Sequence, residues 1–347
     1  MKYAIINDQH FGVNGDSEYF HRNYEKFYSN IFFPGLKQHG VEAVLIPGDF
    51  WQSRKQINPL TLAEAQRQFL GPLADLKIPV FIAYGNHDTY YKNTNAVNTI
   101  DFLGEMYGNI EVIPEYKELD GGVCLMSWIC PDNRNALLKT IETTKSKYLV
   151  GHFEIEGHMM TPGYPCPHGL PKSLFSRFEK VISGHFHVRG NDGKVFYTSN
   201  PSQTSWADYN QPKGFHIFDT ASGELTPVDN PYTVYEVHDW SPESDFKAVK
   251  ESLADKIVKI TIPSFSASDI TKFKAFVNEV IAIAHKVTIV ETQKFEGGSE
   301  LVVQGEVARL SLRDVVKDYV EETAPENLKE ACVATMDELY TRAAKES

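Results

Sequence analysis

Five apolar runs of strand length occur in the first two hundred residues, and each one ends at polar residues. The runs are Tyr3–Ile6, Ala43–Pro47, Ile82–Tyr84, Tyr148–Val150 and Lys180–Ser183. Continuous apolar runs of this length are typical of strands that are buried on both faces. Helices are predicted between the first three runs, over Phe20–Phe33 and Thr61–Leu70. The order of strand, helix, strand and helix predicts an α/β fold with a doubly wound sheet and right-handed crossovers.

The pattern changes near residue 230, where Asn230-Pro231 interrupts the chain. Beyond this point the order is β-α-β-α-β. The predicted elements are a strand over Tyr232–Val237, a helix over Pro242–Leu253, a strand over Ile257–Ile262, a helix over Ser268–Ala284 with Ser268 as its N-cap, and a strand over Val287–Thr292. We therefore expect residues 1–230 to form the principal domain and residues 231–305 a smaller α+β cap domain.

The last segment, residues 306–347, predicts a helical tail. Leu312, Val316 and Tyr319 recur at helical spacing before Pro325, and apolar residues resume this spacing up to Leu339. From residue 310 onward the tail has a net charge of −4, from five Lys or Arg against nine Asp or Glu. Its apolar stripes are therefore expected to dock on protein and not on DNA, either on a partner or on the cap domain of the same chain.

The composition is that of a soluble globular protein. With 347 residues and 42% hydrophobic content, the chain can bury the cores of one large and one smaller domain. It has no run of about twenty apolar residues and no apolar leader, so we expect no membrane association and a cytoplasmic location. The four cysteines lack C-x-x-C spacing, which favours reduced thiols.

The net charge of −12 argues against tight binding of free DNA, because DNA affinity comes largely from Lys and Arg that neutralise phosphates. Divalent ions, a locally basic rim or a basic partner would have to overcome this charge. The acidity is equally compatible with a simple role in solubility.

Metal-ligand residue types stand at the carboxyl end of all five apolar runs. In an open α/β sheet, ligands bind in the crevice outside these ends. Seven side chains could therefore meet at one point: Asp8, His10, Asp49, Asn86, His152, His185 and His187. Such a mixture suits manganese, iron or zinc better than calcium or magnesium, because several ligands are nitrogen. Two ions roughly 3.5–4 Å apart with one bridging carboxylate match this number of ligands. The alternative is that these residues cap loops or line polar pockets.

The polar residues form an ordered series of motifs: Asp8-x-His10, Gly48-Asp49, Gly85-Asn86-His87-Asp88, Gly151-His152 and Gly184-His185-x-His187. This series resembles that of the calcineurin-like metallophosphoesterases, and within them the SbcD-type nucleases that process double-strand breaks. Thr198–Thr204 and Gly214–Phe218 are similar to the tailed-phage branch of these nucleases. The resemblance covers residues 1–220 and implies two sheets stacked face to face and flanked by helices.

The resemblance also implies a function. A protein of this kind is an exonuclease and single-strand endonuclease subunit that acts on DNA in recombination and double-strand-break repair. Its partner is an SMC-like coiled-coil ATPase, which the helical tail would bind, and it forms a homodimer through the first domain. Its two divalent ions are most simply Mn²⁺, with Mg²⁺ as the alternative. A phage-encoded member would act in the host cytoplasm.

The same resemblance assigns roles to the motif residues. One ion would be held by Asp8, His10, Asp49 and His187, and the other by Asp49, Asn86, His152 and His185. His87 is the candidate acid for the departing sugar oxygen, because an imidazole titrates near neutral pH, and Asp88 is the candidate to orient it. The alternative role for His87 is a hydrogen bond to substrate without proton transfer.

Candidate substrate contacts follow the second and third motifs. Cations beside aromatic side chains near a phosphodiester site could hold the DNA backbone and stack bases. These candidates are Arg54, Lys55, Tyr90, Tyr91 and Lys92. Ordinary solvated loops are the alternative interpretation.

Two departures from related sequences bear on function. Gln52 stands three residues after Asp49, where related nucleases often have Asp or His, which puts the surroundings of the ligands in question. The Gly-Asp-x-Val-Asp-Arg-Gly run of protein phosphatases is missing, which argues against a phosphoprotein phosphatase. The remaining alternatives are a small-molecule metallophosphodiesterase and a scaffold without chemistry; the presence of every ligand type argues against the scaffold.

Overall fold

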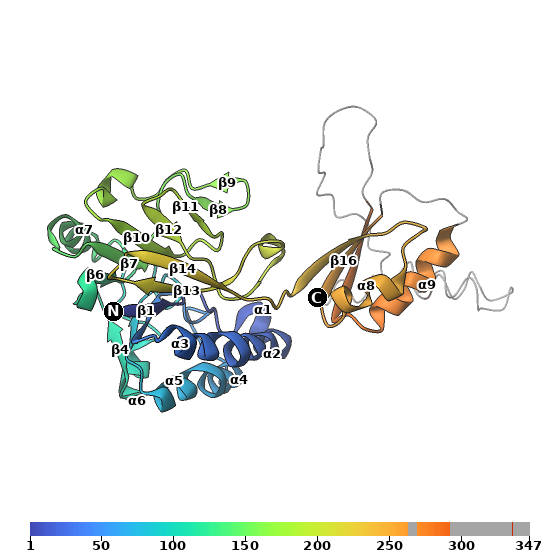
Figure 1. The fold of residues 1–347 in the computed structure, drawn as a ribbon, viewed down its shortest axis with the longest axis horizontal. Helices are drawn as coiled ribbons and strands as arrows, with labels where there is room; N and C mark the ends of the chain where they lie inside the picture. The colour runs from blue at the N-terminus through green and yellow to red at the C-terminus, as the bar shows by residue number, and fades with distance from the viewer. Residues whose placement is uncertain (263–268, 292–334, 336–347) are drawn as a thin grey trace. The chain divides into compact units, whose positions relative to one another are not determined.

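The structure is a computed structural model that describes residues 1–262, 269–291 and 335 (Figure 1). The chain divides into two compact units, Met1–Tyr235 and Glu236–Ser347, which are described separately below. The finer assignment of residues 231–305 to a cap domain and of residues 306–347 to a partner-binding tail stays a prediction. The predicted tail helices lie outside the described residues, apart from residue 335.

The first sheet of the first unit has six strands in the order β14-β13-β1-β2-β3-β4. Its four parallel strands are β1 (Lys2–Ile5), β2 (Ala43–Pro47), β3 (Val80–Ala83) and β4 (Ile110–Ile113). The antiparallel strands β13 (Gly214–Asp219) and β14 (Glu224–Asp229) extend it beyond β1. The chain thus returns after the fifth apolar run to complete the sheet with which it began.

The second sheet also has six strands, in the order β11-β12-β10-β7-β6-β5. The parallel strands are β6 (Val123–Met126), β7 (Tyr148–His152), β10 (Lys180–Gly184) and β12 (Val195–Tyr197). The edge strands β5 (Tyr116–Leu119) and β11 (Gly190–Asn191) pair antiparallel. A separate hairpin joins β8 (Met159–Thr161) to β9 (Tyr164–Pro165).

The two sheets pack against each other through one shared hydrophobic core. Tyr3, Ile5 and Leu45 of the first sheet join Val150 and Ile182 of the second in this core, and all five are buried. Neighbouring residues along a strand point to opposite faces, so the intervening side chains face away from the partner sheet. This stacking confirms the two-sheet fold implied by the resemblance, whereas the residue pattern alone predicted only a doubly wound sheet.

Helices cover the outer face of each sheet (Figure 1). The first sheet is covered by α2 (Glu18–Phe27), α3 (Phe33–His39), α4 (Pro59–Ala65) and α5 (Gly71–Leu76). Aromatic side chains fill this layer: the ring centroids of Tyr28 and Phe69 are 4.9 Å apart, and those of Phe32 and Phe215 are 5.0 Å apart. The second sheet is covered by α7 (Arg134–Thr143), whose Ile141 packs in the outer core.

Both predicted helices of the first unit continue past their expected ends, to His39 and to Leu76. A π-helical turn precedes each continuation, η1 over Tyr28–Phe32 and η2 over Gln66–Leu70. Pro34 and Pro72 stand in the first turn of the helix that follows each π turn. Because proline lacks an N–H and its ring clashes with an α-helical turn before it, the wider turn lets the helix continue.

Short elements complete the first unit. They are α1 (Val13–Asp16), α6 (Asp101–Met106), and the 3₁₀ turns η3 (Asp120–Gly122), η4 (Lys172–Phe175) and η5 (Trp206–Asp208). Cys124, Cys130 and Cys166 are buried free thiols, and Cys332 lies outside the described residues.

The second unit contains a three-stranded sheet in the order β15-β16-β17 and two helices. Its elements are β15 (Tyr235–Asp239), α8 (Phe246–Leu253), β16 (Ile257–Ile262), α9 (Ile270–Ile281) and β17 (Lys286–Glu291). Trp240, Val258 and Val280 contribute to its core. The order matches the predicted β-α-β-α-β pattern. Helix α8 begins later than predicted because the Asp245 side chain caps it at Lys247 N. The predicted cap Ser268 and the predicted strand end Thr292 lie outside the described residues.

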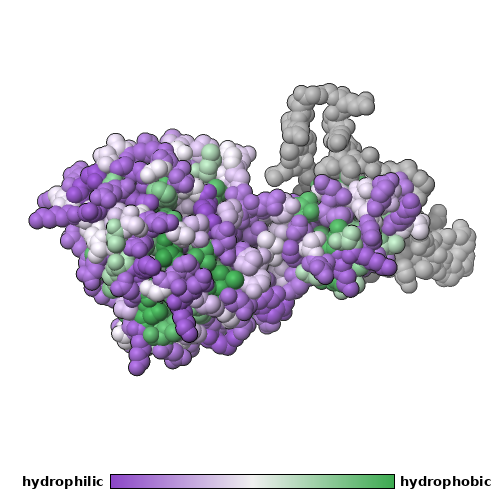
Figure 2. All heavy atoms as spheres, in the orientation of Figure 1, coloured by the Kyte–Doolittle hydropathy of each residue, from purple (hydrophilic) through white to green (hydrophobic). Residues whose placement is uncertain are grey.

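Hydrophilic side chains cover most of the visible face of the first unit, with patches of hydrophobic side chains between them (Figure 2). Within the described part of the chain, none of the helices has the length and apolar character needed to cross a membrane.

We predict that Ser127→Ala destabilises the first unit by about 1–3 kcal/mol, because it leaves two buried backbone groups without partners. Ser127 follows β6, donates to Ile113 O at 2.6 Å and accepts from Tyr84 N at 2.8 Å, so it joins the second sheet to the first. Urea unfolding measures the effect. Thr143→Ala is the matched control, because its exposed hydroxyl bonds only its own helix, and it should change stability by less than about 0.5 kcal/mol. Equal effects of the two substitutions would contradict this prediction.

Candidate metal centre

The seven predicted ligand residues lie together at the carboxyl ends of five strands. Strands β1, β2 and β3 of the first sheet and β7 and β10 of the second all end at this place, because both sheets present the carboxyl ends of their parallel strands to the same edge. The residues form overlapping groups in which the ligand atoms lie within 4.8 Å of one another. The sequence prediction of a single meeting point therefore agrees with the geometry, while the role of each residue stays a proposal.

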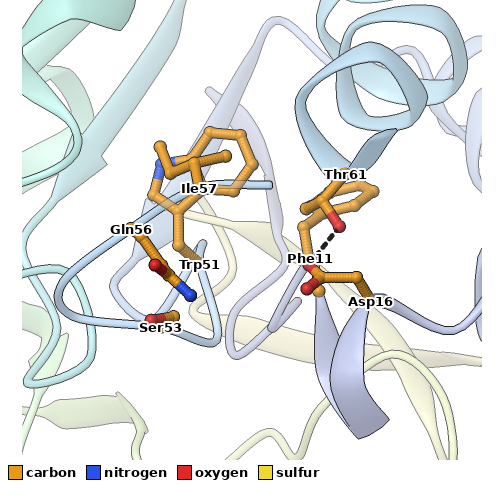
Figure 3. Close-up of a pocket in the computed structure, with 8 residues that line it drawn as sticks. Phe11, Asp16, Trp51, Ser53, Gln56, Ile57 and Thr61 are labelled. Carbon is orange, nitrogen blue, oxygen red and sulfur yellow. Dashed lines mark hydrogen bonds between the residues drawn. The ribbon is translucent and has the colours of Figure 1, made fainter. Parts of the chain in front are cut away.

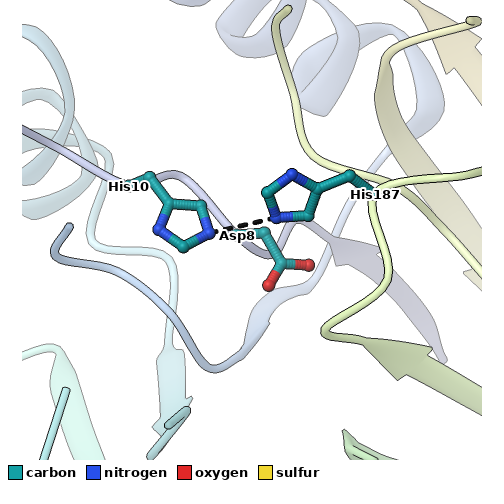
Figure 4. Close-up of side chains that lie close together, drawn as sticks. All are labelled: Asp8, His10 and His187. Carbon is teal, nitrogen blue, oxygen red and sulfur yellow. Dashed lines mark hydrogen bonds between the residues drawn. The ribbon is translucent and has the colours of Figure 1, made fainter. Parts of the chain in front are cut away.

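The first group consists of Asp8, His10 and His187. His10 Nε2 and His187 Nε2 are 3.1 Å apart, and Figure 4 shows the two rings pointing toward one another with the Asp8 carboxylate beside this contact. All three side chains are buried or nearly so. Two imidazole nitrogens and a carboxylate thus face a common point.

The second group consists of Asp49, His152 and His185, with Asn86 beside them. Asn86 Oδ1 lies 2.8 Å from His152 Nε2 and 2.9 Å from His185 Nδ1, and these two nitrogens are 3.1 Å apart. Ligand atoms bonded at about 2.1 Å to one octahedral ion lie about 3 Å from each other. The spacing of these three atoms therefore fits a single divalent ion.

Asp49 lies between the two groups. Its Oδ2 is 3.4 Å from His152 Nε2 and 3.7 Å from His10 Nε2, and its Oδ1 accepts a hydrogen bond from His87 N at 2.7 Å. Asp49 Oδ2 is thus within 4 Å of a ring nitrogen from each group, which is the position that a bridging ligand requires.

The electrostatics of the cluster suit bound cations. Burial lowers the pKa of His10 and His187 and lowers that of His185 to about 3, so these imidazoles are neutral and offer ring lone pairs. Burial likewise raises the pKa of Asp8. A cation would favour the ionised form of this carboxylate by attraction. Neutral imidazoles beside buried carboxylates are the donor set of a manganese, iron or zinc site.

His152 and Asp49 interact strongly. Burial lowers the pKa of His152, but the charge and hydrogen bond of Asp49 and the charges of Asp8 and Asp88 together outweigh burial and raise that pKa to about 9. Burial raises the pKa of Asp49, but His152 and His10 together hold it well below its usual range. Asp49 is therefore ionised throughout the neutral range.

Four of the seven residues adopt left-handed backbone conformations that are rare for residues other than glycine. The φ angles are 52° at Asp8, 48° at His10, 52° at Asp49 and 87° at His185. Such conformations cost about 1–3 kcal/mol each and cluster at functional sites. The strain falls on ligand residues at strand ends, where it turns their side chains toward the common point.

The glycines beside the candidate ligands allow neighbouring motif segments to pack closely against each other. Gly85 has no positive φ, but an added Cβ there would collide with the backbone nitrogen and the carboxylate of Asp49. At Gly48, where φ is 102°, an added Cβ would lie 2.6 Å from Gly85 Cα and 2.8 Å from His152 Nδ1. Motifs two and three thus pack backbone against backbone.

The surroundings of His87 differ from the sequence prediction. Its Nδ1 lies 2.7 Å from Gln52 O, so the main chain of Gln52 orients the ring, whatever side chain stands at position 52. Its ring also lies edge-on to the His10 ring, with centroids 4.8 Å apart. His87 belongs to a third group of possible ligands, with His10 and Asp49. A metal-binding role for His87 is therefore open to test beside the acid role.

The Asp88 carboxylate accepts hydrogen bonds from the main chain of the motif loops, and this contact replaces the predicted role of orienting His87. Its carboxylate is fully buried and accepts hydrogen bonds from Asp49 N at 2.8 Å, Gly85 N at 2.8 Å and Trp51 N at 3.1 Å. Burial and the charge of Asp49 raise its pKa to about 8. Asp88 thus fixes the backbone on both sides of Asp49, a role that the motif alone did not indicate.

The predicted substrate contacts lie on the loops after β2 and β3, outside the seven-residue cluster. Arg54 is half-buried and lies over the Trp128 ring, 5.8 Å from its centroid. Tyr90 and Tyr91 are exposed, with ring centroids 4.7 Å apart, and Lys55 and Lys92 are exposed as well. The four exposed side chains are open to solvent, whereas Nη1 of Arg54 is buried.

A small hollow lies between the loops that follow β1 and β2. Its lining residues are Phe11, Gly12, Asp16, Trp51, Ser53, Gln56, Ile57 and Thr61 (Figure 3). Thr61 Oγ1 donates to Asp16 Oδ1 at 2.6 Å across one side of it. The hollow contains none of the seven cluster residues, so the metal centre is a separate feature.

Lys213 was not among the predicted site residues, yet its ammonium donates to the main-chain oxygen of His187. A lysine in a polar segment between two strands is normally solvent-exposed, and only the fold shows that this one is buried.

We predict that Gly85→Ala weakens Mn²⁺ binding by about 10–100-fold, because the new methyl group displaces Asp49. Isothermal titration calorimetry on the metal-free protein measures the affinity. Gly108→Ala is the matched control: Gly108 also lacks a positive φ, and an added Cβ there meets open space, so it should bind Mn²⁺ like the wild type. Unchanged affinity in Gly85→Ala would contradict the packing argument.

Comparison with known proteins gives concordant results. The calcineurin-like phosphoesterase family matches residues 1–189. Exonuclease subunit 1 of Enterobacteria phage T4 is 27% identical over 357 residues, which cover 99% of each chain. An SbcCD nuclease subunit from Staphylococcus epidermidis is 21% identical over 258 residues, which cover 65% of this chain and 67% of the relative.

Among solved structures, an archaeal phosphodiesterase covers 66% of this chain and all of its own, with a TM-score of 0.34 and 16% identity. The family match extends over more than half of the chain and includes all five motifs up to His187. The predicted class of enzyme, a metal-dependent phosphodiesterase, is thereby confirmed, and the chain belongs to the calcineurin-like phosphoesterase family.

Proposed function

We propose that this protein is a Mn²⁺-dependent DNA nuclease, with exonuclease and single-strand endonuclease activity, that works as one subunit of a complex in recombination and double-strand-break repair. The observation that carries the proposal is the position of the Asp49 carboxylate between two groups of buried ligand atoms. Two relatives whose names describe them as nuclease subunits support the choice of DNA as the substrate.

The ligand roles follow from the groups. Asp8, His10, Asp49 and His187 would hold one ion, and Asp49, Asn86, His152 and His185 the other. When bound, such a pair of ions supplies Lewis-acid stabilisation of phosphoryl oxygens and lowers the pKa of water. The rest of the unit keeps the ligands in place through Asp88 and the close packing of Gly48 and Gly85.

His87 is proposed to protonate the departing sugar oxygen of the DNA strand. The carbonyl of Gln52 can only accept a hydrogen bond, so Nδ1 of His87 carries a hydrogen and Nε2 is the atom left to exchange a proton. The fixed ring orientation is what general acid catalysis requires. The same geometry serves a substrate-orienting hydrogen bond.

The DNA would pass over the loops that follow β2 and β3. Arg54, Lys55 and Lys92 can contact phosphates, and Tyr90 and Tyr91 can stack on bases. With a net charge of −12, the chain needs help to hold DNA, which a partner protein would supply.

The proposed partner is an SMC-like coiled-coil ATPase bound by residues 306–347, and the proposed assembly includes a homodimer of the nuclease in the cytoplasm. Support for a partner comes from the relatives, both named as subunits, and from the apolar stripes of the tail sequence. Size-exclusion chromatography with light scattering tests the dimer directly.

We expect the purified protein with Mn²⁺ to degrade end-labelled DNA and to hydrolyse a chromogenic phosphodiester, and to do neither after chelation. Asp49→Asn should lower both activities by at least about 10²-fold, because it removes the ligand shared by both groups. Hydrolysis of the chromogenic substrate without any cleavage of DNA would favour a small-molecule phosphodiesterase. Loss of neither activity in Asp49→Asn would contradict the proposed centre.

We predict that His87→Ser lowers DNA cleavage by about 10²–10⁴-fold while two equivalents of Mn²⁺ still bind, because general acid catalysis contributes that factor. Calorimetry and cleavage are measured on the same preparation. His168→Ser, a change of the same type at an exposed position, should leave both values at the wild-type level. Loss of one equivalent of Mn²⁺ in His87→Ser would make His87 a ligand instead.

A further inference from the structure

Lys213 is a buried lysine whose three ammonium hydrogens all have partners. The residue is 3% exposed. Its Nζ donates to Asp208 Oδ1 at 2.5 Å, to Asn200 Oδ1 at 2.6 Å and to the main-chain oxygen of His187 at 2.8 Å. An ammonium group has three donors, so no further contact is available to it.

The partners of Lys213 are themselves fixed. The second oxygen of Asp208 accepts from Thr204 N at 2.8 Å and from Ser205 N at 3.0 Å, which holds the carboxylate in a single orientation. Asn200 donates through Nδ2 to Ser202 O at 2.6 Å, which leaves its Oδ1 facing the ammonium. The Lys213 donor is thus held rigidly from two sides.

The segment that carries His187 has little other main-chain support. Strand β10 ends at Gly184 and β11 begins at Gly190. Within the described chain, no backbone-to-backbone hydrogen bond is formed by Phe186, His187 or Val188. The Lys213 ammonium therefore supplies the hydrogen bond that ties the main chain at His187 to the rest of the unit.

A buried ion pair is a poor way to gain stability, because desolvation of both charges offsets their attraction. The pair of Lys213 and Asp208 has side chains that are 3% and 4% exposed, so it bears that full cost. The ion pair does, however, hold a hydrogen-bond donor against the His187 carbonyl. An apolar pair of the same size has no such donor.

We propose that Lys213 is a positioning residue of the metal centre: its ammonium, held by Asp208 and Asn200, fixes the His187 main chain and so places the His187 imidazole against Asp8 and His10. The inference rests on the proposed function, since it concerns one of the two ion positions. It goes further by making that position dependent on a residue outside all five motifs.

The proposal has a selective consequence. His187 belongs to the group with Asp8 and His10, whereas Asn86, His152 and His185 form the other group. Loss of the Lys213 contact should weaken one Mn²⁺ equivalent and leave the second at its wild-type affinity. A lysine with only a general structural role would affect both equivalents alike.

The experiment compares Mn²⁺ binding by full-length proteins in calorimetry and electron paramagnetic resonance. The test variant is the double substitution Asp208→Asn with Lys213→Met, which removes both charges and leaves no buried carboxylate unpaired. We expect one of two equivalents to bind about 10–100-fold more weakly, with the spectrum of an isolated Mn²⁺ ion replacing that of a coupled pair at intermediate Mn²⁺ concentration. Asn200→Ser, which removes one anchor of Lys213 without removing a charge, should weaken the same equivalent by a smaller factor.

Ile141→Ala is the control for lost stability, because Ile141 belongs to α7 and its side chain is fully buried in the outer core of the second sheet. Thermal unfolding verifies that it is at least as destabilised as the double variant, and it should bind both equivalents like the wild type. Wild-type affinity for both equivalents in the double variant and in Asn200→Ser, or an equal loss of both, would overturn the positioning role. Absence of Mn²⁺ binding by the wild type would overturn the metal centre itself.

Discussion

The Asp49 carboxylate is the point on which the structure of the first unit depends. It is buried, ionised and within 4 Å of imidazoles from both groups of the cluster. Its backbone nitrogen donates to Asp88, and its own oxygen accepts from His87 N. The bare glycine at position 85 provides the space beside it. A buried charge of this kind is tolerable only where donors and cations surround it, so the neighbouring motifs are constrained together.

The stacked sheets make this constraint possible. The first sheet brings Asp8, Asp49 and Asn86 to its edge, and the second brings His152 and His185 to the same edge. Side chains from both sheets fill a common core behind the site, and Ser127 bonds the two sheets beside Tyr84. Because packed cores resist small displacements, ligand atoms from segments far apart in sequence hold spacings near 3 Å.

The loop between β12 and β13 connects the site to the rest of the unit. Thr198 and Ser199 contact Asn7 beside Asp8, and Lys213 contacts His187 from the far end of the same loop. Gln203 accepts hydrogen bonds from Val234 N and Tyr235 N, where the chain leaves the first unit. A single loop thus contacts the residue beside Asp8, the main chain of His187 and the segment at which the chain leaves the first unit.

The sequence by itself determined the strands and the candidate ligands. Apolar runs that end at Asp, Asn and His are a local signal, and parallel strands bring their carboxyl ends to one edge, so the meeting of Asp8, Asp49, Asn86 and His185 follows from pattern alone. The predicted helix ends at Phe33 and Leu70 were wrong. A π turn before each proline lets the helix continue, and the spacing of apolar residues does not reveal such a turn.

Only the tertiary structure decided how the ligands are supported. Asp88 bonds the backbone at residues 49, 51 and 85, and the Gln52 carbonyl orients His87, although the prediction was that Asp88 orients it. Lys213 and Asp208 are charged residues in a polar segment, which is typical of a surface loop, and yet both are buried. Their roles depend on main-chain atoms and on burial, and the amino-acid sequence reveals neither. Almost every residue carries the same backbone N–H donor, so only the fold decides which of these donors a carboxylate contacts.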